Sequence, residues 1–149
     1  MKMAEEDIIQ TIKERFPDRA IETFKASPKR IYIDVKKEDA RDVIGYLFHD
    51  LGGRFATASG VDTRAGIEIL YHMAFDKKQY KIVTVRALVS KPFPEIDSMA
   101  TIIPGAAWIE REIHDLFGVN FIGHPDLRRL ILADDWPEGK YPYLREEKV

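Results

Sequence analysis

Six carboxylate and imidazole side chains lie close together in the second half of the chain: Glu110, Glu112, His114, Asp115, His124 and Asp126. Groups of these types can bind a metal ion or transfer protons. Glu110 and His114 are four residues apart and can share one face of a helix, but the zinc-protease pattern needs two histidines at that spacing with a glutamate between them. A stand-alone metal-dependent enzyme that uses Glu110, His114 and His124 stays open as an alternative, without a recognised motif to support it.

Other common catalytic motifs are absent from the sequence. It contains no glycine-rich dinucleotide fingerprint, no phosphate-binding loop, no serine-nucleophile motif and no cysteine. Without cysteine the chain cannot form a disulfide, a thiolate-ligated zinc site, an iron–sulfur cluster or a thiol nucleophile. These absences argue against an enzyme that acts alone, and we assign no catalytic, cofactor-binding or metal-binding residue in this chain.

The composition is that of one globular domain. The 149 residues are 45% hydrophobic, which is enough to fill a core, and the net charge of −2 argues against a nucleic-acid binder. No apolar run approaches the roughly 20 residues of a membrane span, and the acidic N-terminus lacks a signal-peptide pattern, so we expect a soluble cytoplasmic protein. A charged fraction of 32% with one asparagine and two glutamines is typical of proteins from hot environments.

Hydrophobic periodicity predicts the elements that must position these residues. They are, in order, a helix over Met3–Phe16, a hairpin of Ile21–Phe24 and Ile31–Val35, a helix over Glu38–Leu51, an antiparallel meander of Phe55–Val61, Ile67–Phe75 and Tyr80–Val89, a short helix over Ile96–Ile103, and a helix from Pro104 to Phe117. The main order, α-β-β-α-β-β-β-α, indicates an α+β fold: a largely antiparallel mixed sheet with helices packed on one face. Residues 1–118 form this domain and residues 119–149 an extended C-terminal tail.

The helix from Pro104 to Phe117 has two distinct faces. Ala106, Ile109, Ile113, Leu116 and Phe117 form its core stripe. Trp108, Arg111 and Asp115 lie on the opposite face, and a tryptophan among charged residues is typical of an interface. Ordinary surface charges on a solvated helix are the alternative interpretation of that face.

The C-terminal tail is too hydrophobic to be a solvated disordered segment. Its large apolar residues are Phe121, Ile122, Leu127, Leu130, Ile131, Leu132, Trp136, Tyr141, Tyr143 and Leu144, and its six acids and five bases nearly balance. The tail must be covered by packing and not by electrostatic attraction. It either folds back over its own domain or lies on another protein, and the aromatic and arginine anchors favour the second.

Two consecutive blocks of the sequence carry a family resemblance. The first is Pro104-Gly105-Ala106-Ala107-Trp108-Ile109-Glu110-Arg111-Glu112-Ile113-His114-Asp115-Leu116-Phe117-Gly118-Val119-Asn120-Phe121, and the second is Gly123-His124-Pro125-Asp126-Leu127-Arg128-Arg129-Leu130. Together they resemble the signature of the 30 kDa subunit family of respiratory complex I, which includes the homologous subunit of membrane-bound nickel–iron hydrogenases. The order of the preceding elements agrees with that family's domain.

The resemblance implies an accessory subunit without a cofactor, on the cytoplasmic side of the membrane, in the hydrophilic arm of an ion-translocating oxidoreductase. It implies docking on the large catalytic subunit, beside iron–sulfur subunits, with a quinone site or nickel–iron centre in the partners. Two departures from the family pattern are the tyrosine within Pro142-Tyr143-Leu144-Arg145 and the histidine at position 114, which is nearer the hydrogenase-type relatives. Besides the complex subunit and the stand-alone enzyme, a third possible function is an adaptor for an unrelated partner.

Eight residues lie at signature positions of the resemblance and are assigned structural and docking roles: Glu110, Arg111, Glu112, Asp115, His124, Asp126, Arg128 and Arg129. We add to the predicted docking residues Trp108 of the helix face and Phe121, Trp136, Tyr141 and Arg145 of the tail. Arg128 and Arg129 suit bidentate contacts to partner carboxylates. An internal ion pair of these arginines with Glu110, Glu112 or Asp126 is equally open at this point.

Overall fold

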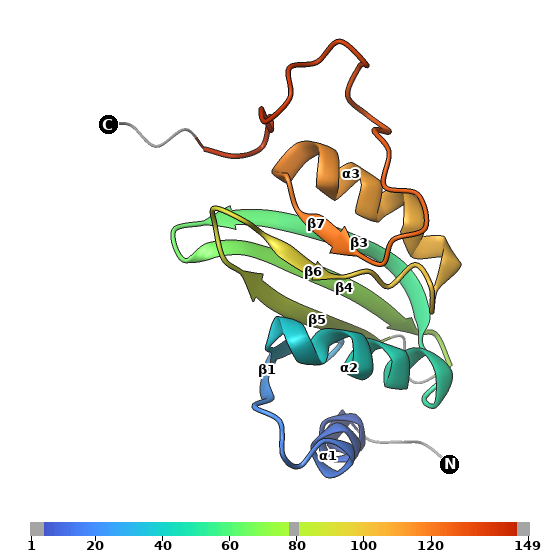
Figure 1. Cartoon of the computed structure of the whole chain (residues 1–149). Helices are drawn as coiled ribbons and strands as arrows, with labels where there is room; N and C mark the ends of the chain where they lie inside the picture. Colours follow the sequence, from blue (N-terminus) through green and yellow to red (C-terminus); the bar gives the residue numbers. More distant parts are fainter. Residues whose placement is uncertain (1–4, 78–80, 146–149) are drawn as a thin grey trace.

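The long helices and the five strands of the main sheet follow the predicted order in the computed structural model, which describes residues 5–77 and 81–145. The elements are α1 (Glu5–Arg15), β1 (Glu22–Ser27), β2 (Arg30–Val35), α2 (Lys37–His49), β3 (Arg54–Thr63), β4 (Gly66–Phe75), β5 (Lys81–Val89), β6 (Glu95–Asp97), a 3₁₀ turn (Pro104–Ala106), α3 (Ala107–Phe117) and β7 (Asn120–Ile122). Figure 1 shows the elements in space. Parts of the predicted turn between the fourth and fifth strands, and the last residues of the tail, lie outside the described residues.

The main sheet has the strand order β1-β2-β5-β4-β3. The predicted hairpin β1–β2 and the predicted meander β3–β4–β5 are both antiparallel, and the two units join where β2 runs parallel to β5, with Ile33 opposite Val85. A largely antiparallel mixed sheet is therefore confirmed. The parallel pair is possible because α2 and the β3–β4 hairpin supply a long enough crossover.

The core lies between one face of this sheet and the helices. Alternate β4 residues Ile67, Ile69, Tyr71, Met73 and Phe75 are almost completely buried, in one cluster with apolar residues of all three α-helices. Helix α2 contributes the stripe Ala40, Val43, Ile44 and Leu47, which follows the 3.6-residue period. The helices therefore cover one face of the sheet, as predicted.

Two sequence-based predictions about the region between β5 and the tail are wrong. The predicted helix over Ile96–Ile103 is absent: Glu95–Asp97 form β6, and Met99 then accepts backbone hydrogen bonds from Ile102 and Ile103 in a turn. The tail also begins later than residue 119, because Asn120–Ile122 form β7, which runs parallel to β6. This small pair lies between α2 and α3 (Figure 1). The domain body therefore extends to Ile122.

Within the described residues, none of the helices is long and apolar enough to cross a membrane.

Candidate functional site

The segment after β7 follows α3 and returns to the sheet; we call residues 123–145 the strap. It contains no helix or strand in the part of the chain that the structure describes. Figure 1 shows the strap running along α3, projecting away from the body in a loop and coming back beside the C-terminal end of the helix. Its position therefore depends on hydrogen bonds to α3 and to the sheet.

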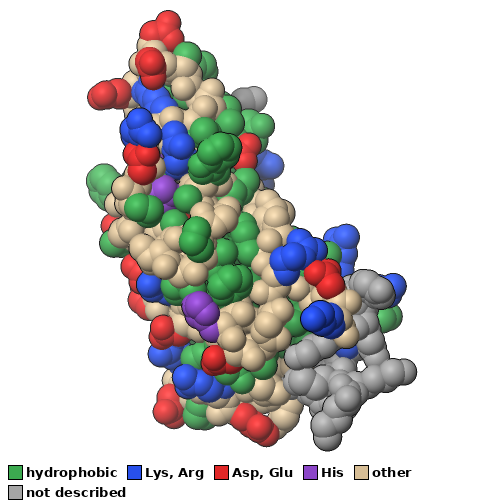
Figure 2. All heavy atoms as spheres, turned by 90° about the vertical axis from the view of Figure 1, so that its right-hand side faces the viewer, with side chains coloured by type: hydrophobic (Ala, Val, Ile, Leu, Met, Phe, Trp, Pro, Cys, Tyr) green, Lys and Arg blue, Asp and Glu red, His purple; other side chains and the backbone are tan. Residues whose placement is uncertain are grey.

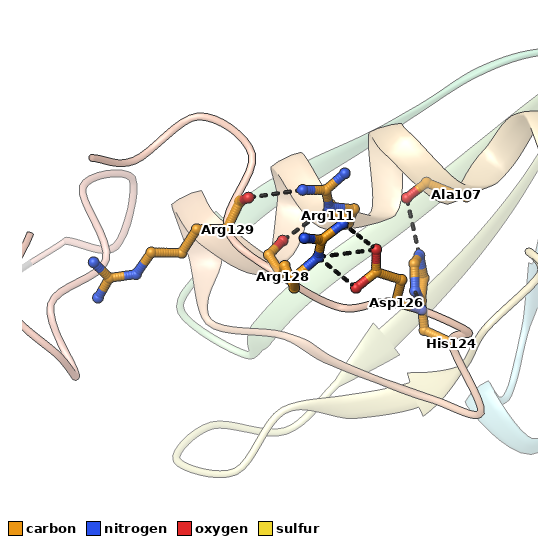
Figure 3. Close-up of polar contacts among 6 residues, drawn as sticks. All are labelled: Ala107, Arg111, His124, Asp126, Arg128 and Arg129. Carbon is orange, nitrogen blue, oxygen red and sulfur yellow. Dashed lines mark hydrogen bonds and ion pairs between the residues drawn. The ribbon is translucent and has the colours of Figure 1, made fainter. Parts of the chain in front are cut away.

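The first attachment is made by His124. Its Nε2 lies 2.9 Å from the carbonyl oxygen of Ala107, at the start of α3, and its Nδ1 accepts the backbone N–H of Asp126 at 3.0 Å. Since a carbonyl can only accept, Nε2 carries the proton, and Nδ1 must be unprotonated to accept from Asp126. The two contacts thus assign Nε2 as the donor and Nδ1 as the acceptor, and Figure 3 shows the contact of His124 with Ala107.

The second attachment is made by Arg111, one turn further along α3. Its guanidinium donates from Nε to the carbonyl of Arg128 at 2.9 Å and from Nη2 to the carbonyl of Arg129 at 2.7 Å (Figure 3). The planar fork of an arginine suits two neighbouring acceptors of this kind. Arg111, which was expected on the docking surface, thus holds the strap of its own chain.

The third attachment is made by Asp115, which the strap covers almost completely. Oδ2 accepts the backbone N–H groups of Leu130, Ile131 and Leu132 at 2.8, 2.7 and 3.1 Å. Burial by itself would raise the pKa of Asp115, but the three N–H donors outweigh it and hold that pKa below the usual value. The carboxylate is therefore charged at neutral pH and closes this part of the strap around itself.

The far end of the strap seats on the C-terminal end of α3 and on the sheet. Tyr143 N–H donates to the carbonyl of Leu116, one of the last carbonyls of the helix, at 3.0 Å. Arg145 N–H donates to Oδ2 of Asp62 at 2.8 Å, and the other oxygen of Asp62 pairs with Lys91. Both ends of the projecting loop are thus fixed to the domain body.

Gly118 provides the seat for Tyr141, so Gly118→Ala should loosen this end of the strap. Gly118 has φ 75°, and a Cβ placed there would lie 2.5 Å from the Tyr141 ring. We expect a loss of about 1–3 kcal/mol of unfolding free energy, from the left-handed backbone and the displaced ring together. Chemical denaturation measures it.

The matched control for this prediction is Gly105→Ala. Nothing lies within 4 Å of a Cβ built on Gly105, and its φ is not positive. The two variants should therefore differ by at least about 1 kcal/mol. Equal stability of the two would contradict the seat that we describe for Tyr141.

The arginines of the strap make internal contacts. Arg128 forms a bidentate ion pair with Asp126, with Nη2 2.7 Å from Oδ2, so the internal pair is the one that forms at this residue. The Arg129 side chain points away from that cluster (Figure 3) and donates to the carbonyls of Ala133 and Asp134 at 2.8 and 3.0 Å.

Several predicted docking residues are buried within the chain and cannot touch a partner in this structure. Phe121 and Asp115 are 1% and 2% exposed, because β7 packs Phe121 into the core and the strap covers Asp115. Glu110 has no exposed surface. In this structure the three side chains therefore make internal contacts, where the sequence-based prediction gave them docking roles.

Glu110 holds the region between β6 and α3 together. Oε1 accepts the hydroxyl of Ser98 at 2.6 Å, and Oε2 accepts the hydroxyl of Tyr71 at 2.7 Å and the N–H of Met99 at 3.0 Å. Burial, assisted by the Glu110 carboxylate, raises the pKa of Tyr71 well above its usual value, so the phenol keeps its proton. Ser98 and Tyr71 could not be predicted as partners of Glu110, because neither has a local spacing relation to it in the sequence.

The structure does not support the alternative of a metal site formed by Glu110, His114 and His124. Glu110 faces Ser98, His124 bonds to the start of α3, and His114 Nδ1 lies 2.8 Å from the carbonyl of Val119. Over the described ranges, the structure brings no three histidine, cysteine or carboxylate side chains together as a metal site. Glu110, His114 and His124 thus belong to three separate contacts.

Large apolar side chains remain exposed on the strap and around it. They are Trp108 (71% exposed), Phe93, Ile122, Leu130, Ile131, Trp136 and Tyr143. Figure 2 shows hydrophobic side chains gathered in a band on one face of the molecule, with charged side chains toward its margins. A groove of about 650 Å³ separates the Lys91–Glu95 loop from the end of the strap. Exposed apolar surface of this kind is typical of protein–protein contacts.

Some of the remaining predicted docking residues are exposed, and others are half-buried. Trp108 and Trp136 are exposed, although the Trp136 indole N–H donates to the Lys140 carbonyl at 2.8 Å. Tyr141 and Glu112 are half-buried. Arg145 is exposed, while its backbone bonds to Asp62.

Known proteins resemble this chain in sequence and in fold. Hydrogenase-4 component G of Escherichia coli (strain K12) is 32% identical over 95% of this chain, which spans about a quarter (26%) of that relative. Membrane-bound hydrogenase subunit beta of Pyrococcus furiosus is 29% identical, covering 96% of this chain and 86% of the relative. A chain in the structure of the membrane-bound sulfane sulfur reductase, an archaeal respiratory membrane complex, has the same fold: TM-score 0.81 at 24% identity, covering 93% of this chain and 82% of that one.

The family assignment rests on a match that spans most of the chain. The family model described as the respiratory-chain NADH dehydrogenase, 30 kDa subunit, matches residues 33–149. These residues include the second half of β2, the strands β3, β4 and β5, the helices α2 and α3, and the whole strap, so the match covers the elements that build the site as well as its signature residues. The chain therefore belongs to the family of the 30 kDa subunit of the respiratory-chain NADH dehydrogenase.

Proposed function

We propose that this chain is an accessory subunit that docks, through the strap and the outer face of α3, on the large catalytic subunit of a membrane-bound, ion-translocating oxidoreductase. The subunit stands on the cytoplasmic side and supplies binding surface, while neighbouring subunits carry the iron–sulfur clusters and the quinone site or nickel–iron centre. The observation that carries the proposal is the exposed apolar surface of the strap in a member of a family of complex subunits.

The relatives support a large neighbouring partner. Hydrogenase-4 component G is one polypeptide in which a region similar to this chain accounts for about a quarter. The rest of that protein is joined to the similar region within the same polypeptide. A separate polypeptide that lies in the same position beside this chain would cover the apolar residues of the strap.

Co-purification from the native host tests the proposal. A tagged copy of the chain is expressed, membranes are solubilised gently, and the proteins that accompany it are identified by mass spectrometry. We expect a large catalytic subunit with iron–sulfur subunits. Two Cys-x-x-Cys pairs in the large subunit would indicate a nickel–iron hydrogenase, and their absence beside a quinone or flavin module would indicate a complex I type. A chain that purifies alone and never with membranes would refute the proposal.

Trp108→Ala should weaken docking without weakening the fold. The side chain is 71% exposed, so its removal should change the unfolding free energy by no more than about 0.5 kcal/mol. A tryptophan at the centre of an interface commonly contributes about 2 kcal/mol or more, so we expect at least about tenfold less co-purified partner. Quantitative mass spectrometry of the tagged complex measures this.

Phe24→Ala is the matched control. Phe24 is 60% exposed and lies on the edge strand β1, which is remote in the sheet order from β3, the strand that α3 contacts. Partner yield with Phe24→Ala should equal that of the wild type. Loss of partner in both variants, or in neither, would remove α3 from the docking surface.

A further inference from the structure

We propose that helix α3 shapes residues 124–132 of the strap before any partner binds, and that the partner recognises them through an uncharged apolar recess that accepts Leu130 and Ile131, not through the edge of a β-sheet. The inference rests on the proposed function, because it names the chemistry of the partner surface at the same site. Three observations support it. Backbone N–H and C=O groups of the strap are already hydrogen-bonded to α3, the arginines of the strap are paired within the chain, and the three attachment points on α3 are four residues apart.

The backbone of the strap is already hydrogen-bonded to α3 over residues 128–132. The N–H groups of residues 130–132 are all donated to Asp115, and the carbonyls of Arg128 and Arg129 both accept from Arg111. Strand addition needs free N–H and C=O groups along the peptide. Over these residues the partner must therefore recognise side chains.

The charges beside this segment are also satisfied internally. Arg128 is paired with Asp126, and Arg129 donates to two carbonyls of the strap itself. Leu130 and Ile131, the apolar side chains that follow this ion pair, are 37% and 54% exposed, while Arg128 and Asp126 are exposed as a pair with each other. An apolar recess without a charged group fits these two side chains, since an unpaired charge buried against them would cost free energy.

The spacing of the attachments fixes the shape of the segment. The three anchors on α3 are at Ala107, Arg111 and Asp115, four residues apart, and therefore on one side of the helix. Eight residues of helix rise about 12 Å, whereas the seven residues from His124 to Ile131 could span about 23 Å if fully extended. The strap is thus held in a compact course, and a partner loses little free energy in ordering it.

The free chain tests the first half of the proposal. Amide hydrogen exchange of the full chain should show protected N–H groups at residues 130–132. Asp115→Ala should speed their exchange by at least about tenfold, while Asp115→Asn, which keeps an acceptor oxygen but not the charge, should give an intermediate rate. If Asp115 only fills space, Asn should behave as the wild type.

The control for this measurement is Glu112→Ala. Glu112 lies on the same helix, and the structure gives it no hydrogen bond to the described part of the strap. It should leave the exchange rates at 130–132 unchanged. Amides of β4 and β5 in the same samples report whether each variant is folded. Fast exchange at 130–132 in the folded wild type would overturn the claim that the strap is preformed.

Co-purification from the native host tests the second half. Ile131→Asp places a charge in the proposed recess and should reduce the bound partner at least about tenfold, while amide exchange at the Asp115 anchor stays slow. Asp135→Asn, an exposed change on the same strap, should bind as the wild type does. If the wild type binds no partner, the proposed function fails. If the wild type and Ile131→Asp bind equally, only the apolar recess is wrong.

Discussion

Replacing Glu110 with alanine should lower the free energy of unfolding by about 3–5 kcal/mol, because three buried donors would lose their acceptor at once. Tyr71, Ser98 and Met99 all donate to this carboxylate, and the side chain has no exposed surface. For a domain of this size the melting temperature should fall by roughly 10–15 °C. Differential scanning calorimetry measures it.

Two further variants distinguish the loss of the Glu110 hydrogen bonds from a general effect of substitutions in α3. Glu110→Gln keeps one acceptor oxygen for Tyr71 and Met99, and its amide can donate to the Ser98 hydroxyl, so it should cost less than alanine. Glu112→Ala, two residues away and half-buried, should change the stability by no more than about 0.5 kcal/mol. If Glu110→Ala cost less than about 1 kcal/mol, the buried carboxylate would not hold this junction together.

Local patterns in the sequence were enough to predict most of the helices and strands. The apolar spacing of Val43, Ile44 and Leu47 predicted a helix that the structure has as α2, and Gly118 ends α3 in the left-handed conformation expected of a C-terminal glycine. The alternation along β4 likewise identified its buried face. These features are set by residues within a few positions of one another, so one sequence suffices.

The errors arise where distant residues decide the structure. Ile96 looked helical from its neighbours, yet its backbone lies in β6 because Phe121 of β7 pairs beside it, 25 positions later. The parallel pairing of β2 with β5 is equally non-local. Periodicity within a short window cannot report a partner that is many residues away.

For the site as well, the sequence predicted which residues share a face of α3 but not which residues they contact. The sequence indicated that Arg111 and Asp115 share a face beside Trp108, which is correct, but their role depends on a strap that folds back onto them. Two alternatives were considered for the tail: that it folds back over its own domain, or that it lies on another protein. The strap has features of both. Its backbone is fixed to its own domain, while side chains such as Ile131 remain exposed.

Acid should release the strap from the domain only well below neutral pH. Two carboxylates hold the strap: Asp115, through three backbone N–H groups, and Asp62, which binds Lys91 and the N–H of Arg145. The ion pair with Lys91, followed by the Arg145 N–H, lowers the pKa of Asp62, and the N–H donors lower that of Asp115 despite its burial. Both carboxylates are more acidic in the folded chain than in the unfolded one.

The sign of the pH dependence follows from these directions. A carboxylate whose pKa is depressed by folding stabilises the fold fully above its unfolded pKa, near about 4, and this contribution is lost as the pH falls through the lower folded value. The strap should therefore be unchanged from about pH 8 to about pH 5 and detach below about pH 4. Amide chemical shifts of residues 130–132 and 145, followed by NMR against those of β4, measure the transition.

Asp115→Asn separates the two carboxylates in this experiment. At neutral pH the variant should already show altered amide shifts at residues 130–132, while residue 145, held by Asp62, keeps its wild-type shift and its acid transition. The two ends of the strap are attached to different elements, so one can loosen without the other. A change in the acid transition of residue 145 in Asp115→Asn would instead show that the two ends of the strap loosen together.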